Sequence, residues 1–341
     1  FDYSGGATCP SLLLEPSRDN RIVQSEYFGG WTANTTITAN AALSPEGVQN
    51  AYNIASNSGV GNGILLISGV LSSTQYVCSI YVKSAGATTG KLRLFDGSSG
   101  ASTTTTFTPT SEWQRVEVTR TTGAGTFQVR TDIHSNDGDL LIYGAQLEAG
   151  SYSTSYIPTY GVNQTRAVDV CNKTGVTALI GQSEGTMFLD FVVNDSNIFQ
   201  IIYQVRTTGG TNVGQIDFRI QSGNLRVLGN DGGTAQFNIS AGAAVAGTRY
   251  KCALRYATND VAFYVNGVLK GSDTNASFSS STLSQITFNE NGSNFYPNVD
   301  VKQALLFKTP LSNLDLAILT GATTYNTFAE MALALNYTVY E

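Results

Sequence analysis

The one histidine of this chain limits the chemistry that its 341 residues can perform. Any Ser-His or Cys-His pair would have to use His134, and a metal site with two imidazole ligands cannot form. A catalytic role for His134 would also need an adjacent nucleophile, which the sequence does not identify. We therefore expect His134 to be structural.

The sequence carries no pair of carboxylates with the spacing expected of a glycoside hydrolase. Such an enzyme needs an acid and a nucleophile that flank one bond. Glu112 and Glu117 are five residues apart, which places them on opposite faces of a strand. Asp190 and Asp217 each precede a Phe in an alternating strand, where an outward-facing polar position is expected. We expect the chain not to be an enzyme.

A turn after His134 contains oxygen ligands that suit a hard cation. Asn136, Asp137 and Asp139 could hold a structural Ca²⁺ if other loops complete the coordination shell. The alternative is ordinary turn chemistry, because Asn and Asp also form turns unaided. The sequence therefore requires no cofactor.

Two loops have the composition of a carbohydrate site, which combines aromatic faces with amide or carboxylate groups. One loop spans 229–233 and the other spans 289–297. The candidate sugar-binding residues are Asn230, Asp231, Asn289, Glu290, Asn294 and Tyr296. The alternative for each is a turn residue or a buried aromatic residue.

Charge and hydropathy exclude other classes of partner. Lys and Arg number 19 against 25 Asp and Glu, and the net charge of −6 argues against binding to nucleic acid or anionic lipid. The apolar run 64–71 is too short for membrane insertion. Cys9, Cys78, Cys171 and Cys252 form no CxxC pair, so we expect reduced thiols.

Most of the chain has the pattern of short β-strands. Tyr76, Cys78, Ile80 and Val82 alternate at period two, which predicts a half-buried strand. Two series of strands follow this kind of pattern, and no helix interrupts the first series. The first series is expected at 76–83, 91–95, 113–119, 126–132 and 140–147, and the second at 186–193, 199–206, 214–221, 224–228, 235–239, 249–256, 261–265, 284–288 and 301–307.

Local signals fix a hairpin and two helices in the second half. Asn266-Gly267 between apolar runs predicts a type I′ turn. Helical spacing at 311–319 and a capping box at 327–330, which opens a helix over 328–335, predict short C-terminal helices. The apolar face of the last helix would dock on its own sandwich or on a neighbouring subunit.

The first strand series resembles a module of bacteriophage proteins. The run 9–20, CPSLLLEPSRDN, is similar to a lead-in found in phage fibre and other virion surface proteins. In those proteins the lead-in precedes a carbohydrate-binding-module-like jelly roll, whose closing strands and exit are similar to 112–116, 144–150 and 155–159. This resemblance implies a place on a virion surface.

The second strand series is similar to the laminin-G-like members of the concanavalin A-like lectin and glucanase superfamily. The resemblance rests on 185–188, on 249–256 ahead of the hairpin at 264–267, and on 301–307 with 311–319 after it. Fold resemblance does not determine function.

We therefore expect an all-β chain of two tandem antiparallel β-sandwiches, both jelly rolls, with short C-terminal helices. The expected division is a lead-in segment at 1–25, a jelly roll at 26–158, a connector at 159–178, a concanavalin A-like sandwich at 179–310 and a helical tail at 311–341. The first residue is Phe1, not Met, which is typical of a fragment or a processed product.

The leading functional hypothesis is a non-enzymatic fibre protein on the surface of a phage virion. It would bind host-surface or mucus glycans through weak contacts that oligomerisation repeats, and the resemblance implies a homotrimer that contacts other virion proteins. One alternative is a purely structural assembly component that binds no sugar. The other is a glycan depolymerase.

Overall fold

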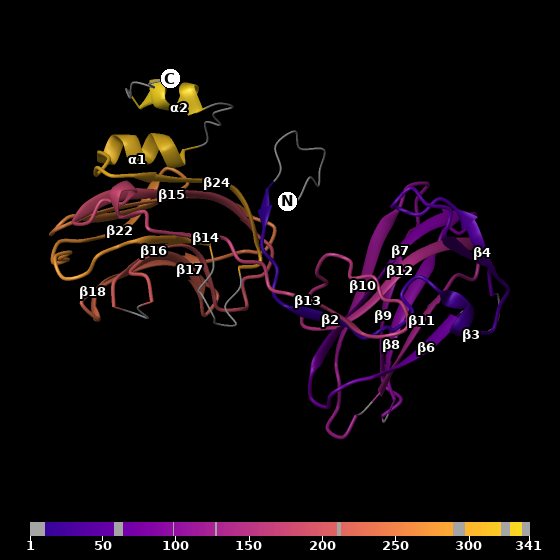
Figure 1. The fold of residues 1–341 in the computed structure, drawn as a ribbon. Coiled ribbons are helices and arrows are strands. Elements are labelled where there is room, and N and C mark those ends of the chain that lie inside the picture. Colours follow the sequence, from indigo (N-terminus) through magenta and orange to yellow (C-terminus); the bar gives the residue numbers. More distant parts are fainter. Residues whose placement is uncertain are drawn as a thin grey trace. The chain divides into compact units, whose positions relative to one another are not determined.

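The computed structural model describes residues 11–57, 64–97, 99–126, 128–209, 213–288, 297–321 and 328–335. The chain is all-β, built from antiparallel sheets with short helices near its C-terminus (Figure 1). Its internal contacts separate two compact units. We call residues 17–168 the first sandwich, and residues 1–16 together with 169–341 the second sandwich.

The first sandwich is inserted between two strands of the second. β1 (Leu12–Leu13) pairs with β24 (Val299–Phe307), so this part of the expected lead-in belongs to the second sandwich. The chain enters the first sandwich through β2 (Arg18–Asn20) and leaves it through β13 (Gln164–Arg166), and these two strands pair with each other. The division therefore falls at 16/17 and at 168/169, within the segments expected as a lead-in and a connector.

Two five-stranded sheets form the first sandwich. One sheet has the order β10-β7-β12-β5-β4, with bounds Gln114–Thr121, Gln75–Ala85, Asp139–Ala149, Ala51–Ile54 and Ile37–Ala42. The other has the order β3-β6-β11-β8-β9, with bounds Thr32–Ala33, Ile64–Gly69, Gln128–His134, Gly90–Asp96 and Ser102–Phe107. A short 3-10 helix lies at Phe28–Gly30.

The predicted core side of β7 is confirmed, because Tyr76, Cys78, Ile80 and Val82 are all buried between the two sheets. The expectation of a half-buried strand is wrong, because Val77 and Ser79 on the other side are also fully buried. Burial raises the pKa of the Cys78 thiol to about 12. This thiol therefore fills the core as a small apolar group.

Two six-stranded sheets form the second sandwich, and a short 3-10 helix lies at Thr177–Leu179. The first sheet has the order β1-β24-β15-β20-β21-β22, in which the last four strands span Glu184–Val193, Arg249–Ala257, Val261–Val265 and Val268–Asp273. The second has the order β14-β23-β16-β17-β18-β19, with bounds Asn172–Thr174, Gln285–Thr287, Gln200–Arg206, Gln215–Gln221, Asn224–Asp231 and Thr234–Ala243.

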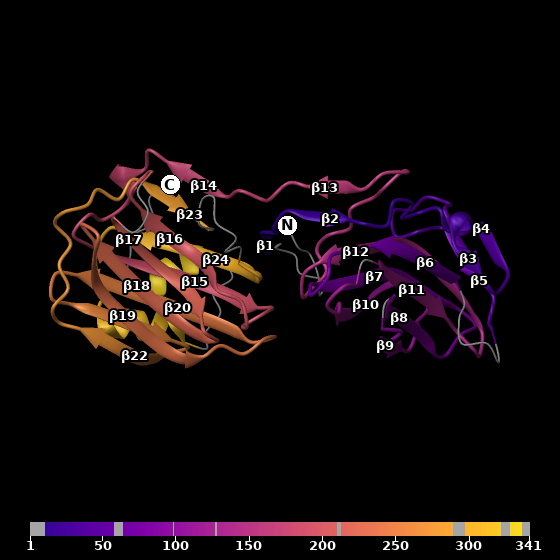
Figure 2. The same ribbon diagram turned by 90° about the horizontal axis from the view of Figure 1, so that it is seen from below.

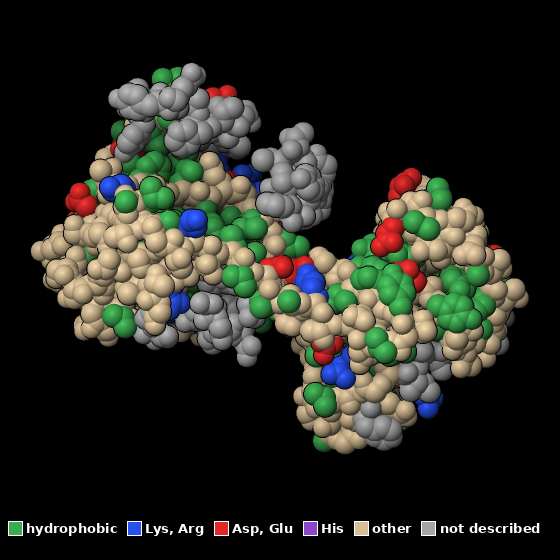
Figure 3. All heavy atoms as spheres, viewed as in Figure 1, with side chains coloured by type: hydrophobic (Ala, Val, Ile, Leu, Met, Phe, Trp, Pro, Cys, Tyr) green, Lys and Arg blue, Asp and Glu red, His purple; other side chains and the backbone are tan. Residues whose placement is uncertain are grey.

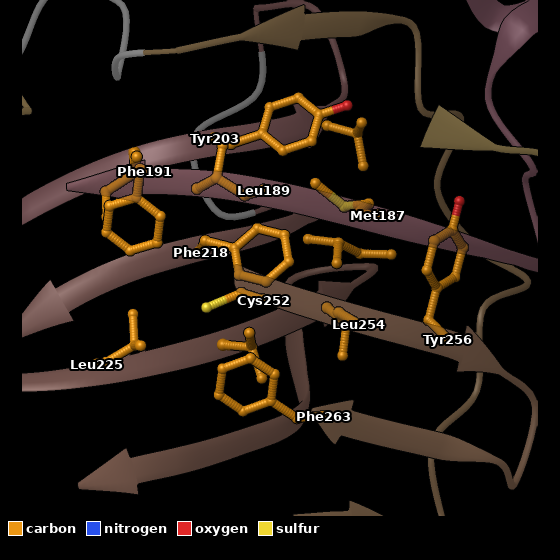
Figure 4. Close-up of a cluster of buried hydrophobic side chains, with 14 of the residues drawn as sticks. Met187, Leu189, Phe191, Tyr203, Phe218, Leu225, Cys252, Leu254, Tyr256 and Phe263 are labelled. Carbon is orange, nitrogen blue, oxygen red and sulfur yellow. The ribbon is translucent and has the colours of Figure 1, made fainter. Parts of the chain in front are cut away.

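The core of the second sandwich lies between these sheets. Met187, Leu189 and Phe191 of β15 pack against Phe218 of β17 and other buried side chains (Figure 4). The alternate residues of each strand therefore lie on the outer faces of the sandwich.

The predicted hairpin and the C-terminal helices are confirmed. Asn266 and Gly267 have φ values of 50° and 82° between the paired ends of β21 and β22, as a type I′ turn requires. α1 (Asn313–Thr320) begins after a capping box at Ser312, and α2 is Phe328–Ala334. Thr327, the expected cap of α2, lies outside the described residues.

α1 and α2 pack on the second sandwich itself. Leu316 and Leu319 of α1, and Met331 of α2, share a buried cluster with Phe188 of β15 and Tyr264 of β21. The sequence left open whether the apolar face of the last helix docks on its own sandwich or on a neighbouring subunit. In the structure, the described part of that face packs on its own sandwich. None of the described helices has the length and apolar character needed to cross a membrane.

Candidate functional site

The two sheets of the second sandwich have outer faces of opposite character. The sheet that contains β15, β20 and β21 has an apolar outer face, which α1 and α2 cover. Figure 2 looks onto β16 to β19 of the other sheet, with the helices on the far side. Hydrophobic side chains gather around α1 in Figure 3, whereas much of the remaining visible surface of this unit is polar or backbone.

The polar outer face follows directly from the sequence of β17. Ile216, Phe218 and Ile220 point into the core, so Gln215, Asp217 and Arg219 lie on the opposite face. The strand pairings then place polar residues of the neighbouring strands beside them. We call the following set the polar sheet face: Gln204, Arg206, Gln215, Asp217, Arg219, Arg226 and Asn230.

Asp217 and Arg219 form a two-point ion pair along one strand. Arg219 donates from Nε to Asp217 Oδ1 at 2.7 Å and from Nη2 to Oδ2 at 2.5 Å. The Asp217 side chain is fully buried and the Arg219 side chain is 9% exposed. The guanidinium also lies over the Phe199 ring, 5.5 Å from its centroid. Such a pair holds the guanidinium in one orientation.

The amides beside this ion pair are also held in place. Gln215 Nε2 donates to Asp217 Oδ2, and Gln204 Nε2 donates to Gln215 Oε1, both at 3.4 Å. Within the described chain, Gln204 Oε1 is buried and accepts no hydrogen bond. A buried acceptor without a donor costs about 1–3 kcal/mol.

β18 and β19 form the more open side of the face. Arg226 and Asn230 are half-buried, and Asn238 of β19 is exposed. Arg226 donates from Nη1 to Asn238 Oδ1 at 2.9 Å. This side offers amide and guanidinium groups to hydroxyls, which can both donate and accept hydrogen bonds.

The structure separates the predicted sugar-binding residues. Asn230 lies on the polar sheet face, opposite Gln215. Asp231 accepts hydrogen bonds from the backbone N–H groups of Ser279 and Ser280, both at 2.8 Å. Burial acts to raise the pKa of Asp231, but hydrogen bonds from the 279–281 segment lower it below its usual value. The Asp231 carboxylate therefore ties this segment to β18.

The second predicted sugar-binding loop lies outside the described residues, and with it Asn289, Glu290, Asn294 and Tyr296. Its starting point is nevertheless fixed by β23. Across the sheet, Gln285 pairs with Arg206, Arg206 with Gln215, and Gln215 with Asn230, so these four residues form one row. Thr287 pairs with Gln204, two residues farther along the strands. Position 288 therefore lies away from the Asn230 row, so the two candidate loops begin at different places along the strands of this sheet.

Two of the predicted calcium ligands, Asn136 and Asp137, lie in the turn after β11, and the third, Asp139, is the first residue of β12. Asn136 is exposed, and the Asp137 carboxylate accepts hydrogen bonds from Thr88 and Ser135, which lower its pKa. Asp139 accepts hydrogen bonds from Asn53 Nδ2 and from the Ser56 backbone, both at 3.0 Å. Among the described residues, no group of three His, Cys, Asp or Glu side chains could hold a metal ion.

His134 lies beside the Arg93–Asp132 ion pair of the first sandwich. Its Nδ1 is 3.3 Å from Asp132 Oδ2, and Arg93 donates from Nε to the same oxygen at 2.6 Å. His134 is 3% exposed and Asp132 is fully buried. These residues stand on the side of β11 opposite Ile133, which packs into the core.

The composition of the loops did not identify Gln204, Arg206, Gln215 and Arg219 as candidate binding residues. The signal for part of this set was present in the sequence of β17, where Gln215, Asp217 and Arg219 alternate with Ile216 and Phe218. Asp190 and Asp217 do lie on outer faces, but both carboxylates are held by arginines, Asp190 by Arg249 at 2.6 Å.

Comparisons with known proteins place this chain in no family. No family model and no curated protein matches it. Among solved structures, it is similar to the CBM40 module of the Ruminococcus gnavus IT-sialidase bound to α2,3 sialyllactose, with 17% identity over 43% of this chain and 86% of the module, and a TM-score of 0.37.

Two other solved structures are similar at the same level. The SAP-like pentraxin of Limulus polyphemus is 14% identical over 42% of this chain and 72% of its own, with a TM-score of 0.36. The leech intramolecular trans-sialidase is 19% identical over 42% of this chain, with a TM-score of 0.37, and the matched part is 24% of that enzyme. Similarity at this level does not assign a function to this chain.

Proposed function

We propose that this chain is a non-catalytic carbohydrate-binding protein whose ligand surface is the polar sheet face. The observation that supports the proposal is the fixed polar array of that face, in which Asp217 holds Arg219 in one orientation and the neighbouring Arg226 and Asn230 are partly accessible. Sugars present neighbouring hydroxyls, which planar amide and guanidinium groups bind well.

The chemistry of the face favours binding over hydrolysis. Hydrolysis of a glycosidic bond usually needs two carboxyl groups, one on each side of that bond. Asp217 is the one carboxylate in the residue set that defines the face, and both of its oxygens accept from Arg219. The proposed role of Asp217 is therefore to position Arg219.

The finer part of the proposal is a place on the surface of a phage particle. It is supported by the lead-in at 9–20, which resembles that of virion fibre proteins. A homotrimer, present in many copies and contacting other virion proteins, would repeat a weak glycan site and so increase the total affinity for host-surface or mucus glycans.

The test is binding of the whole purified chain to an array of bacterial polysaccharides and mucin glycans. We expect binding that falls at least tenfold in the Arg226→Ala, Asn230→Ala double variant. The matched control is Lys270→Ala, an exposed residue on β22 of the other sheet, which should bind as the wild type does. Absence of binding by the wild type, displayed on beads to allow multivalent contact, would support a structural role instead.

A depolymerase would give a different result on the same glycans. Incubation with each bound polysaccharide should release no new reducing ends. Release that Asp217→Asn abolishes, while the variant remains folded, would overturn the non-catalytic part of the proposal.

A further inference from the structure

A groove in the first sandwich shares no residue with the polar sheet face, the predicted calcium ligands or the His134 cluster. It has a volume of about 470 Å³ and is open to solvent. The strand β13 supplies one wall through Gln164, Thr165 and Arg166, and the chain just before it supplies the other. The lining residues of that second wall are Tyr156, Ile157, Pro158 and Tyr160.

The Tyr160 ring is exposed but anchored. Tyr160 is 71% exposed, yet its hydroxyl donates a hydrogen bond to Glu26 Oε1 at 3.2 Å. The backbone is also fixed, because Tyr160 bridges to Gln24 and the Gly161 N–H donates to Val23 O at 2.6 Å. An aromatic face held toward water in this way loses little further conformational entropy when a ligand stacks on it.

Tyr156 is anchored at the same carboxylate and packed from behind. Its hydroxyl is 2.7 Å from Ser25 Oγ and donates to Glu26 Oε1 at 3.3 Å. Its ring packs against those of Tyr143 and Tyr81, at centroid distances of 5.7 Å and 6.3 Å. The pKa of Tyr156 is raised, mainly by desolvation, so its hydroxyl stays protonated and can donate a hydrogen bond.

A glycine of β12 makes room for this arrangement. Gly144 has a φ of 61°, and a Cβ added there would lie 3.2 Å from the Tyr156 ring and 3.3 Å from the Tyr81 ring. The backbone therefore adopts a conformation that glycine tolerates best at the point where the tyrosine cluster packs against it.

The opposite wall supplies hydrogen-bonding groups. Gln164 and Thr165 are exposed, and Thr165 Oγ1 donates to Asp19 Oδ1 at 2.6 Å. The charges near the groove are of both signs: Glu26 lies on the tyrosine side, and Arg166 lies on the β13 side together with Asp19, which holds Thr165. This balance favours an uncharged ligand over an anion or a cation.

We propose that this groove is a second carbohydrate site, which takes a neutral hexopyranose. The apolar face of the sugar ring would stack on Tyr160, and its hydroxyls would bind the Gln164 amide and the Thr165 hydroxyl. The site goes beyond the polar sheet face, because it lies in the other sandwich and uses a stacking aromatic ring. It requires no residue of the second sandwich.

The test uses the whole chain and the methyl glycosides of glucose, galactose, mannose and N-acetylglucosamine. Saturation-transfer difference NMR should detect transfer to the ring protons of at least one glycoside. We expect at least a fivefold loss of transfer in Tyr160→Ala and in Gln164→Ala. Tyr160→Phe keeps the ring and should retain at least half of the transfer.

Two control variants distinguish the groove from the rest of the protein surface. Val162→Ala changes an exposed neighbour, 59% exposed, that does not line the groove, and it should leave the transfer unchanged. Lys270→Ala changes an exposed residue on β22 of the second sandwich, outside both proposed sites, and should also leave it unchanged. Melting curves that match the wild type would show that each variant is folded.

The opposite results would overturn the proposal. Transfer that persists in folded Tyr160→Ala, or no transfer to any of the four glycosides, would show that the groove is not a hexopyranose site. Binding of a proline-rich peptide with no glycoside binding would instead identify a peptide groove. Loss of transfer in Asn230→Ala alone would support the polar sheet face and contradict the groove.

Discussion

Replacing Asp217 with Asn should destabilise the second sandwich by about 3–5 kcal/mol, the usual cost of removing one partner of a buried ion pair. The Asp217 side chain is fully buried and the Arg219 side chain is 9% exposed. The substitution leaves the Arg219 guanidinium in place without the carboxylate that accepts two of its hydrogen bonds. Replacing both residues, with Asp217→Leu and Arg219→Met, removes both charges and should cost less than about 2 kcal/mol.

The assay is urea unfolding read by peptide-resolved hydrogen exchange, which reports the free energy of opening for β16 to β18 separately from the first sandwich. The control is Asp260→Asn. Asp260 pairs with Arg255 at 2.6 Å but its side chain is 53% exposed, and an exposed pair contributes less than about 1 kcal/mol.

Two results would refute this reasoning. The first is a loss in Asp217→Asn no larger than the loss in Asp260→Asn. The second is a double variant as unstable as the single one. Either would mean that the ion pair does not organise the polar sheet face.

Three further predictions test other parts of the structure. Leu316→Ala should destabilise the second sandwich by about 2–5 kcal/mol, measured by the same exchange, because this fully buried side chain joins α1 to the sheet; a loss below about 1 kcal/mol would contradict the docked helix. Iodoacetamide at pH 8 should modify Cys78 and Cys252 only after unfolding, by peptide mass mapping, since both are fully buried and burial raises their pKa values; labelling in the native state would disprove it. Asp231→Asn should reduce the free energy of unfolding at pH 7 by about 1 kcal/mol. The pKa of this carboxyl is lowered in the folded state, so the carboxylate stabilises the fold above its unfolded pKa and loses that contribution as the pH falls. The difference in stability from the wild type should therefore narrow below about pH 4, and a difference that widens in acid would contradict this prediction.

Alternation along single strands made much of the fold predictable. The core side of β7 and of β17 can be read from the alternation within 76–82 and 216–220. The hairpin at Asn266-Gly267 is determined by a few neighbouring residues. The insertion of one sandwich in the other was not predictable in this way. It depends on the pairing of Leu12 with Val301, and pairing between such distant segments leaves no local pattern.

The candidate site was harder to predict for the same reason. Loop composition identified Asn230, and the structure places it on the polar sheet face. Composition treated Asp231 as equivalent, but its carboxylate is bound by Ser279 and Ser280, distant in sequence. Arg206 meets Gln215 only through the register of β16 and β17. Which polar groups converge therefore depends on strand order, which a single sequence does not display.

The most direct test of the central claim is a crystal structure of the whole chain soaked with a glycan that binds it on the array. The account predicts sugar hydroxyls within hydrogen-bond distance of Arg226 or Asn230 on the polar sheet face. A well-occupied glycan elsewhere on the chain, with no sugar at this face, would contradict it.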